Sequence, residues 1–183
     1  MAFVSLTSDG ERDFNFVRGA DIDFVYGESE KEYLERANII HFGSATGFMG
    51  GNLELSYRKM IIEAYEKGKF ISFDPNFREA LIGEDKEKFI AKGHKTLYLC
   101  DVIKVSQEEL ELLTNTGNIH DAIKVLHELG AKRIIVTLGS RGALFSTNMF
   151  QIEVAAPRIT SIDSTGAGDA FVGGMLYRLS DFN

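Results

Sequence analysis

Short apolar segments alternate with amphipathic, helix-like segments from residue 38 onward, and this alternation is the strongest constraint on the fold. We expect strands at residues 38–43, 69–74, 101–105 and 133–138. Between and after them, apolar residues recur with helical spacing, which predicts helices at 53–66, 85–97, 107–113 and 120–129. Strands separated by helices form βαβ units, whose strands are parallel. The pattern therefore predicts an α/β fold with a mainly parallel central sheet flanked by helices.

The start of the chain follows a different pattern. Residues 2–7 and 13–18 alternate polar and apolar side chains around Asp9-Gly10, which predicts a β-hairpin. A short helix is expected over residues 29–37, with Ser29 as its N-cap. We therefore expect two parts, a partial β lid over residues 1–27 and one α/β domain over residues 28–183.

Three further details can be tested against a structure. In the helix predicted at 53–66, the inward-facing residues should be Leu55, Met60, Ile61 and Ala64. Residues 142–145 and 150–154 should form an antiparallel edge of the sheet, because no helix separates them. Residues 166–179 read as a glycine-rich turn that opens a final helix.

Composition narrows the classes of partner. The 183 residues include 20 Lys and Arg against 27 Asp and Glu, a formal charge of −7, which argues against nucleic acid as a partner. No apolar run approaches the roughly 20 residues that span a bilayer, so no membrane partner is expected, and the first residues do not resemble a secretory leader. The single cysteine, Cys100, favours a reducing compartment. A cytoplasmic protein is expected.

The stretch from Asp163 to Gly174, DSTGAGDAFVGG, carries the clearest chemistry. Gly166 and Gly168 allow a tight turn whose amides, with the start of the following helix, can face an anion. Asp169 falls in the first helical turn, where a carboxylate would repel a phosphate unless it accepts a proton from a hydroxyl attacking that phosphate. The alternative is a favourable first-turn acid after a plain tight connection.

Residues 163–169 resemble the C-terminal signature of the ribokinase-like carbohydrate kinases, also called the phosphofructokinase-B family. The resemblance implies a Rossmann-like ribokinase fold with the remnant of a small β lid. It also implies that Asp169 is the catalytic base and that the backbone of Gly166, Ala167 and Gly168 forms the anion hole. In many members of the family, the positions of Asp163 and Thr165 help to hold a monovalent cation such as K⁺. Ser164 stands where many members have Thr.

Residues 104–109, KVSQEE, end the third strand and match a second family motif, Asn-x-x-Glu. Ser106 replaces the Asn, and Glu109 occupies the acidic position that organises Mg²⁺ and phosphate indirectly. By this resemblance, Lys104 and Ser106 are candidates for the nucleotide site. Ser-x-x-Glu at a strand-to-helix junction is also a capping box, and both roles are compatible.

Residues 137–142, TLGSRG, resemble the nucleotide loop of the family, in which Thr137, Gly139 and Gly142 approach ATP. The alternative is a glycine turn between two strands. Residues 73–78, FDPNFR, follow the second strand, and Pro75 ends that strand. Asn76 and Arg78 should therefore project from the carboxyl end of the sheet, the edge at which open α/β sheets bind ligands.

Asp-Pro-Asn-x-Arg is similar to the sequence of fructokinases and 2-keto-3-deoxygluconate kinases, in which the Asn and Arg line the cleft near sugar and phosphates. In the same subgroup a Phe-x-Phe-x-Arg strand belongs to the lid, so Arg18 is expected to reach the sugar. A homodimer through the lid strands is a further expectation.

The resemblance implies ATP-dependent phosphorylation of a sugar hydroxyl with Mg²⁺, fructose being the first substrate and ribose, 2-keto-3-deoxygluconate and nucleosides the alternatives. A non-catalytic nucleotide-binding or dimerisation fragment is another alternative, because such kinases have roughly 300 residues and we expect this sequence to be truncated at both ends, with little turnover alone. A dinucleotide-binding loop at 43–51 lacks the Gly-x-Gly-x-x-Gly spacing, and no P-loop sequence occurs.

Overall fold

A six-stranded sheet forms the centre of the molecule. The computed structural model describes residues 2–6, 12–160 and 163–181. In spatial order the strands are β3 (Ile39–Gly43), β4 (Phe70–Asp74), β5 (Val102–Ser106), β6 (Arg133–Thr137), β7 (Ala143–Thr147) and β8 (Gln151–Val154). The first four strands are parallel and the last two are antiparallel. The predicted mainly parallel sheet with an antiparallel edge is confirmed.

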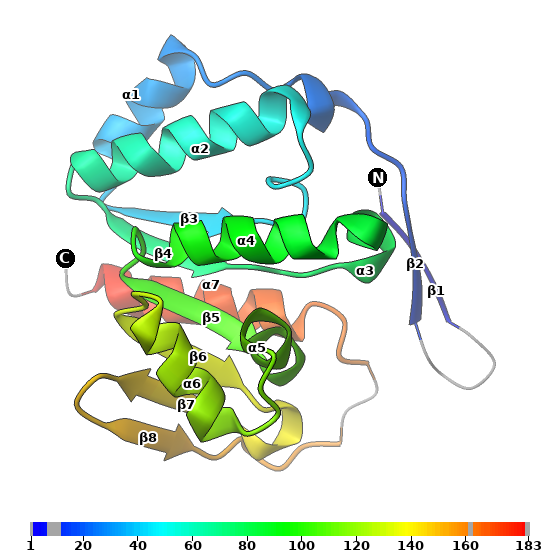
Figure 1. Ribbon diagram of the computed structural model, residues 1–183, viewed down its shortest axis with the longest axis vertical. Coiled ribbons are helices and arrows are strands. Elements are labelled where there is room, and N and C mark those ends of the chain that lie inside the picture. The colour runs from blue at the N-terminus through cyan, green and yellow to red at the C-terminus, as the bar shows by residue number, and fades with distance from the viewer. Residues whose placement is uncertain (1, 7–11, 161–162, 182–183) are drawn as a thin grey trace.

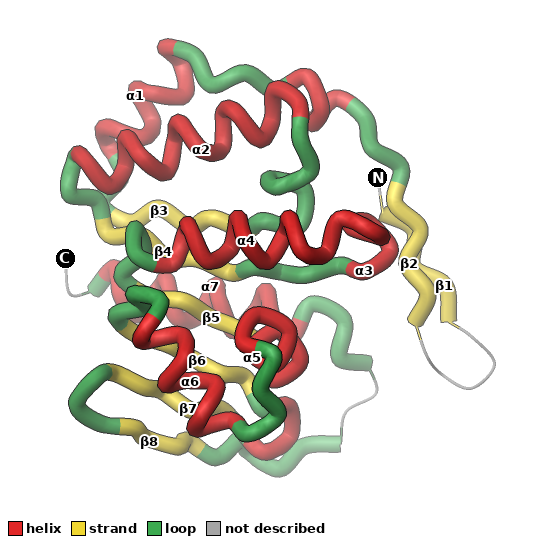
Figure 2. The backbone as a smooth tube through the Cα atoms, in the orientation of Figure 1, coloured by secondary structure: helices red, strands yellow, loops and turns green. Residues whose placement is uncertain are grey.

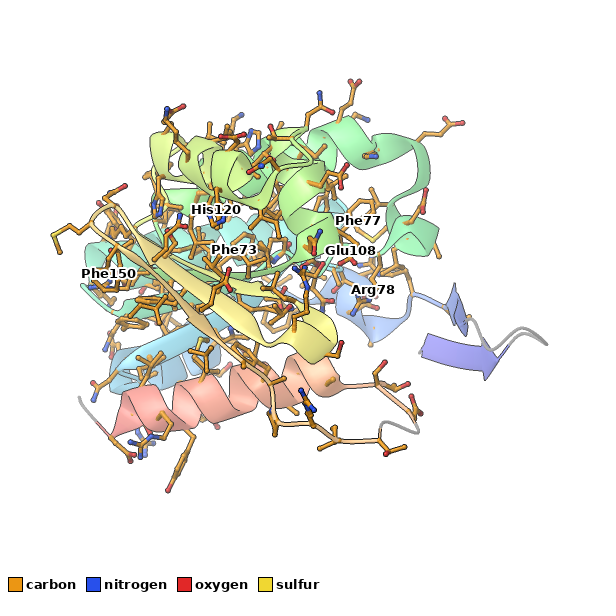
Figure 3. All side chains as sticks on the ribbon, turned by 90° about the horizontal axis from the view of Figure 1, so that it is seen from below. Phe73, Phe77, Arg78, Glu108, His120 and Phe150 are labelled. Atoms are coloured by element: carbon orange, nitrogen blue, oxygen red, sulfur yellow. The ribbon has the colours of Figure 1, made fainter. Side chains whose placement is uncertain are left out.

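Helices cover the two faces of this sheet unequally (Figures 1 and 3). One face carries α2 (Gly51–Glu66), α4 (Lys86–Leu97), α5 (Gln107–Thr114) and α6 (Ile119–Glu128), whereas the other carries α7 (Ala167–Ser180). The helix α1 (Glu28–Arg36) lies next to α2, and a short helix α3 (Glu79–Ile82) precedes α4. Single 3-10 turns lie at Ala20–Asp23, Gly83–Asp85 and Gly139–Arg141.

The first two strands form a sheet of their own. β1 (Ala2–Leu6) and β2 (Arg12–Phe16) pair antiparallel, as predicted, and project beside α3 at one side of the α/β body (Figures 1 and 2). The expected turn at Asp9-Gly10 lies outside the described residues. The predicted cap of α1 was wrong, because the N-cap is Gly27, whose amide donates to the Glu30 carboxylate (2.9 Å), and Ser29 lies inside the helix.

The core between the sheet and the four-helix layer is rich in aromatic rings. Phe48 packs against Tyr57 of α2, Phe73 of β4 and Phe89 of α4, at centroid distances of 5.4, 6.2 and 5.4 Å. Each such pair adds roughly 0.5–1.5 kcal/mol to the free energy of burial. The contacts tie α2 and α4 to the same face of the sheet.

The inward face of α2 differs from the one predicted. Ile61 and Ala64 are buried as expected, but Leu55 is 66% exposed. The buried positions are instead Ser56 and Tyr57, because the Ser56 hydroxyl accepts from the amide of Tyr26 and donates to the Phe24 carbonyl. The buried stripe of α2 therefore begins at Ser56 and Tyr57, where residues 24–26 cross the helix, and continues through Ile61 and Ala64.

The layer formed by α7 buries little. All residues of α7 are described, and among them Val172 is the one that is buried. On the β8 edge, Ile152 and Val154 are more than half exposed. Among the described residues, no helix is long and apolar enough to cross a membrane.

Candidate functional site

A buried ion pair joins the carboxyl ends of β4 and β5. Ser72 pairs with Val102 in the parallel register, so Asp74 and Lys104 follow side by side two residues later. The Lys104 ammonium donates to Asp74 Oδ2 at 3.1 Å, and both side chains are less than 10% exposed. Removing one partner of such a pair would leave the other as an uncompensated buried charge, so each side chain depends on the other for its place in the protein interior.

The chain leaves β4 through a tightly bonded turn. The Asn76 amide donates to Asp74 Oδ1 (3.0 Å), and Asn76 has a left-handed backbone (φ 48°), which Asn tolerates better than most residues. The Ser44 hydroxyl, fully buried at the end of β3, donates to the Pro75 carbonyl (2.6 Å). Asn76 and the following Arg78 therefore lie at the carboxyl edge of the sheet, as predicted.

Arg78 lines a cavity of about 420 Å³ between this turn and α5. Figure 3 shows Phe77, Arg78 and Glu108 together at this edge, whereas Phe150 lies toward the opposite edge. The remaining lining residues are Glu79, Ser106, Glu109 and Leu112. The predicted residues Arg78, Ser106 and Glu109 thus share one hollow.

Ser106 and Glu109 form the capping box that the sequence allowed. The Glu109 amide donates to Ser106 Oγ (3.1 Å), and the Ser106 amide donates to Glu109 Oε2 (2.8 Å). The second oxygen, Oε1, accepts from the Phe77 amide (2.8 Å). Burial, together with the charge of Asp74, raises the pKa of Glu109.

This bonding bears on the expected metal role of Glu109. Both of its oxygens already accept backbone amides, so the side chain fits an indirect role toward Mg²⁺, through water, better than direct ligation. Among the described residues, no group of three or more His, Cys, Asp or Glu side chains is arranged to hold a metal ion. Mg²⁺ commonly binds through substrate phosphates and one or two carboxylates, and such a site needs no protein cage.

The loop after β6 lies at the same edge. Thr137 pairs with Ser106 across β5 and β6, and its hydroxyl donates to the Val105 carbonyl (3.3 Å). Gly139 has a positive φ (60°) and open space around its Cβ position. A Cβ on Gly142 (φ 114°) would lie 1.9 Å from the Val154 carbonyl oxygen, so the backbone that follows β8 leaves room only for glycine at this position.

The start of α7 lies beside Lys104 of the buried ion pair, on the other face of the sheet. Gly166 (φ 76°) is the N-cap of α7, and a Cβ on Gly168 would lie 3.5 Å from Lys104 Nζ. Asp169 is exposed in the first turn of the helix. Asp163 Oδ1 accepts from both the amide and the hydroxyl of Thr165 at 2.8 Å.

Arg18 lies apart from this group. It follows β2, and its guanidinium pairs with the Asp21 carboxylate in the adjoining turn. The hairpin contacts α3, the helix that begins directly after Arg78. The strand that precedes Arg18 thus lies beside α3, while the Arg18 side chain itself is paired with Asp21.

Three residues around the site were not among the predicted site residues. Asp74 and Ser44 hold the turn at 75–78, and His41 of β3 lies 3.1 Å from the Ser72 hydroxyl. Burial lowers the pKa of His41, and the carboxylates of Asp74 and Asp169 partly offset this. The available signals were the Asp before Pro75 and the polar Ser44 directly after the strand expected at 38–43.

Comparison with known proteins places the chain among sugar kinases. Residues 1–183 match the family described as pfkB family carbohydrate kinase. Fructokinase-1 of Oryza sativa subsp. japonica is 37% identical over 182 residues, covering 98% of this chain and 56% of that protein. The chain therefore spans about half the length of the curated relatives it matches.

Two solved structures share the fold closely. Fructokinase of Xylella fastidiosa with bound ATP gives a TM-score of 0.83 at 34% identity, covering 98% of this chain and 56% of that one. Fructokinase of Vibrio cholerae O395, bound to fructose, ADP and calcium ion, gives a TM-score of 0.82 at 32% identity, covering 98% and 58%. The expected ribokinase-like α/β fold is confirmed.

Proposed function

The chain belongs to the pfkB family of carbohydrate kinases, and on this basis we propose that it transfers the γ-phosphate of ATP to a sugar hydroxyl, with fructose as the leading substrate. One observation carries the proposal. The turn at 166–168 opens α7 directly beside Lys104, and Asp169 stands in the first turn of that helix. A carboxylate, a row of backbone amides and an ammonium thus meet at one edge of the sheet.

In the proposed reaction, Asp169 accepts the proton of the sugar hydroxyl as its oxygen attacks the γ-phosphorus. The bond from that phosphorus to the bridging oxygen breaks, and ADP leaves with the electron pair. The amides of Gly166, Ala167 and Gly168 stabilise the charge on the transferring phosphoryl group. Lys104 lies close enough to Gly168 to add a positive charge there.

The other candidates take supporting roles in this proposal. Lys104, Ser106, Thr137, Gly139 and Gly142 form the nucleotide side, and Arg18, Asn76 and Arg78 form the sugar side. Mg²⁺, when bound with ATP, would neutralise phosphate charge, and Glu109 would act on it through water. Asp163 and Thr165 offer the hard oxygen atoms that K⁺ prefers, and their mutual hydrogen bonds hold them together.

The two-part division belongs to the same proposal. Residues 1–27 act as a lid over the sugar and residues 28–183 as the catalytic domain. The separate β1–β2 sheet supports this division and supplies strand edges through which a second copy could pair, a dimer that light scattering would detect. We also propose a cytoplasmic location, where a free thiol such as that of the buried Cys100 stays reduced.

The test is ADP formation by the natural protein that contains these 183 residues, with Mg-ATP, K⁺ and a panel of sugars. We expect fructose to give the highest kcat/KM, and Asp169→Asn to lower turnover about 10²–10⁴-fold while Mg-ATP still binds. Preference for ribose, 2-keto-3-deoxygluconate or a nucleoside would change the substrate only. Binding of Mg-ATP without any sugar-dependent ADP would contradict the kinase and favour a nucleotide-binding module.

A further inference from the structure

The turn that carries Asn76 and Arg78 is held from both sides by buried side chains of other elements. On one side, Ser44 donates to the Pro75 carbonyl (2.6 Å), and its own amide donates to the Asp74 carbonyl (3.1 Å). On the other side, Glu109 Oε1 accepts from the Phe77 amide (2.8 Å). Both of these side chains, Ser44 and Glu109, are less than 10% exposed.

Glu109 is the unusual member of this arrangement, because a capping box needs only one of its oxygens. Oε2 accepts from the Ser106 amide and completes the cap of α5 (2.8 Å). Oε1 reaches across to a residue 32 positions earlier in the chain. One buried carboxylate therefore bonds the start of α5 to the turn after β4, beside the cavity that Arg78 lines.

We infer that Glu109 is a positioning residue that fixes the direction of Arg78 by bonding the Phe77 amide. Phe77 directly precedes Arg78, and the Phe77 ring packs on Phe89 at a centroid distance of 5.4 Å. The hydrogen bond from the Phe77 amide to Glu109 and this ring contact together determine the direction in which the backbone enters α3. The inference rests on the proposed function only in taking the sugar or its phosphate as the ligand that Arg78 contacts. The hydrogen bond between the Phe77 amide and Glu109 does not depend on that function.

A carboxylate suits this role and an amide does not. Glutamine has one acceptor oxygen and one NH₂ group, which is a donor. In Glu109→Gln, either the Phe77 or the Ser106 amide would face that donor and lose its partner. A buried donor left unpaired costs more than the bond itself contributes, so the turn should open more often.

The first experiment is hydrogen exchange at the Phe77 amide, followed by NMR. In the unsubstituted protein we expect exchange at least about tenfold slower than in an unstructured chain. Exchange as fast as in an unstructured chain would overturn the inference without any variant. In Glu109→Gln, exchange at Phe77 should accelerate about tenfold, while the β4 amides stay protected.

Glu108→Gln is the matched control, since Glu108 loses the same charge one residue away, is exposed and lines the same cavity. It should leave exchange at Phe77 unchanged. Equal acceleration in both variants, or none in Glu109→Gln, would contradict a positioning role.

A second readout connects the Glu109–Phe77 hydrogen bond to Arg78, and it is made at saturating Mg²⁺ so that a role of Glu109 toward the metal does not contribute. Under that condition, Glu109→Gln should lower kcat/KM for the sugar about tenfold when Arg78 is present, but less than about twofold in an Arg78→Ala background. Equal losses in the two backgrounds, or full recovery on raising Mg²⁺, would overturn the inference. If no sugar is phosphorylated at all, the proposed function fails and the exchange results decide the inference alone.

Discussion

The two halves of the candidate site differ in how deeply their polar groups are buried. The strand-end half consists of Asp74, Lys104 and Glu109, each of which is less than 10% exposed. Lys104 donates a hydrogen bond to Asp74, and Glu109 accepts one from the Phe77 amide in the turn after β4. Asp163, Thr165 and Asp169, before and in α7, are exposed. Both halves lie at the same edge of the sheet, and Lys104 and Gly168 meet between them.

This difference separates groups that build the site from groups that are placed to act on a ligand. A buried charge must find its partner within the protein, so the strand-end half is already in its final arrangement. An exposed carboxylate near a row of backbone amides keeps water as its main neighbour until a ligand displaces it. We therefore expect substitutions in the first half to reduce stability, and substitutions in the second half to reduce activity.

The largest change in stability should come from Lys104→Met. It leaves Asp74 buried without its cation, and we expect the free energy of unfolding to fall by about 3 kcal/mol or more. Urea unfolding followed by circular dichroism measures this. Lys132→Met is the matched control, because Lys132 pairs with Asp101 on the surface (3.0 Å) and should cost less than about 1 kcal/mol. Similar losses in the free energy of unfolding for Lys104→Met and Lys132→Met would contradict the claim that the buried ion pair matters more to stability than the surface pair.

Substitution of two glycines by Ala should also lower the free energy of unfolding, by no more than Lys104→Met does. In Gly142→Ala the new Cβ meets the Val154 carbonyl at 1.9 Å in a left-handed backbone, and a loss of about 3 kcal/mol is expected. In Gly166→Ala the space is open, so the backbone cost of about 1 kcal/mol remains alone. Thermal unfolding of the two variants checks the order, and a larger loss for Gly166→Ala would contradict it.

The smallest stability change is expected for Thr165→Val in the exposed half. It removes a hydroxyl bonded to Asp163 Oδ1 (2.8 Å) on the surface, and the free energy of unfolding should change by less than about 0.5 kcal/mol. The K⁺ concentration for half-maximal activity should nevertheless rise about threefold to tenfold. Thr160→Val, an exposed threonine outside the signature, is the control. An unchanged K⁺ concentration for half-maximal activity in Thr165→Val would contradict the assignment of Thr165 to the cation site.

Local sequence patterns predicted the elements well because their causes are local. The Ser106 capping box and the glycine turn into α7 depend on residues within a few positions of each other. The bonds that build the strand-end half join residues about 30 positions apart: Ser44 to Pro75, Asp74 to Lys104 and Phe77 to Glu109. No local periodicity contains those pairs.

The errors on α1 and α2 have the same origin. Ser29 looked like a cap, but Gly27 with Glu30 satisfied the helix start two residues earlier. Leu55 looked buried, but Ser56 turned inward to bond a segment that precedes α1. Helical spacing fixes which residues share a face, and tertiary contacts decide which face is covered.

The most direct test of the account is a single-turnover measurement of phosphoryl transfer from ATP to fructose in Asp169→Asn. With both substrates saturating, the account predicts a rate constant lower by about 10²–10⁴-fold, the range for loss of a general base. The Kd for Mg-ATP and the free energy of unfolding should stay unchanged. A rate constant close to that of the unsubstituted protein, with the same Kd, would contradict the assignment of Asp169 as the base.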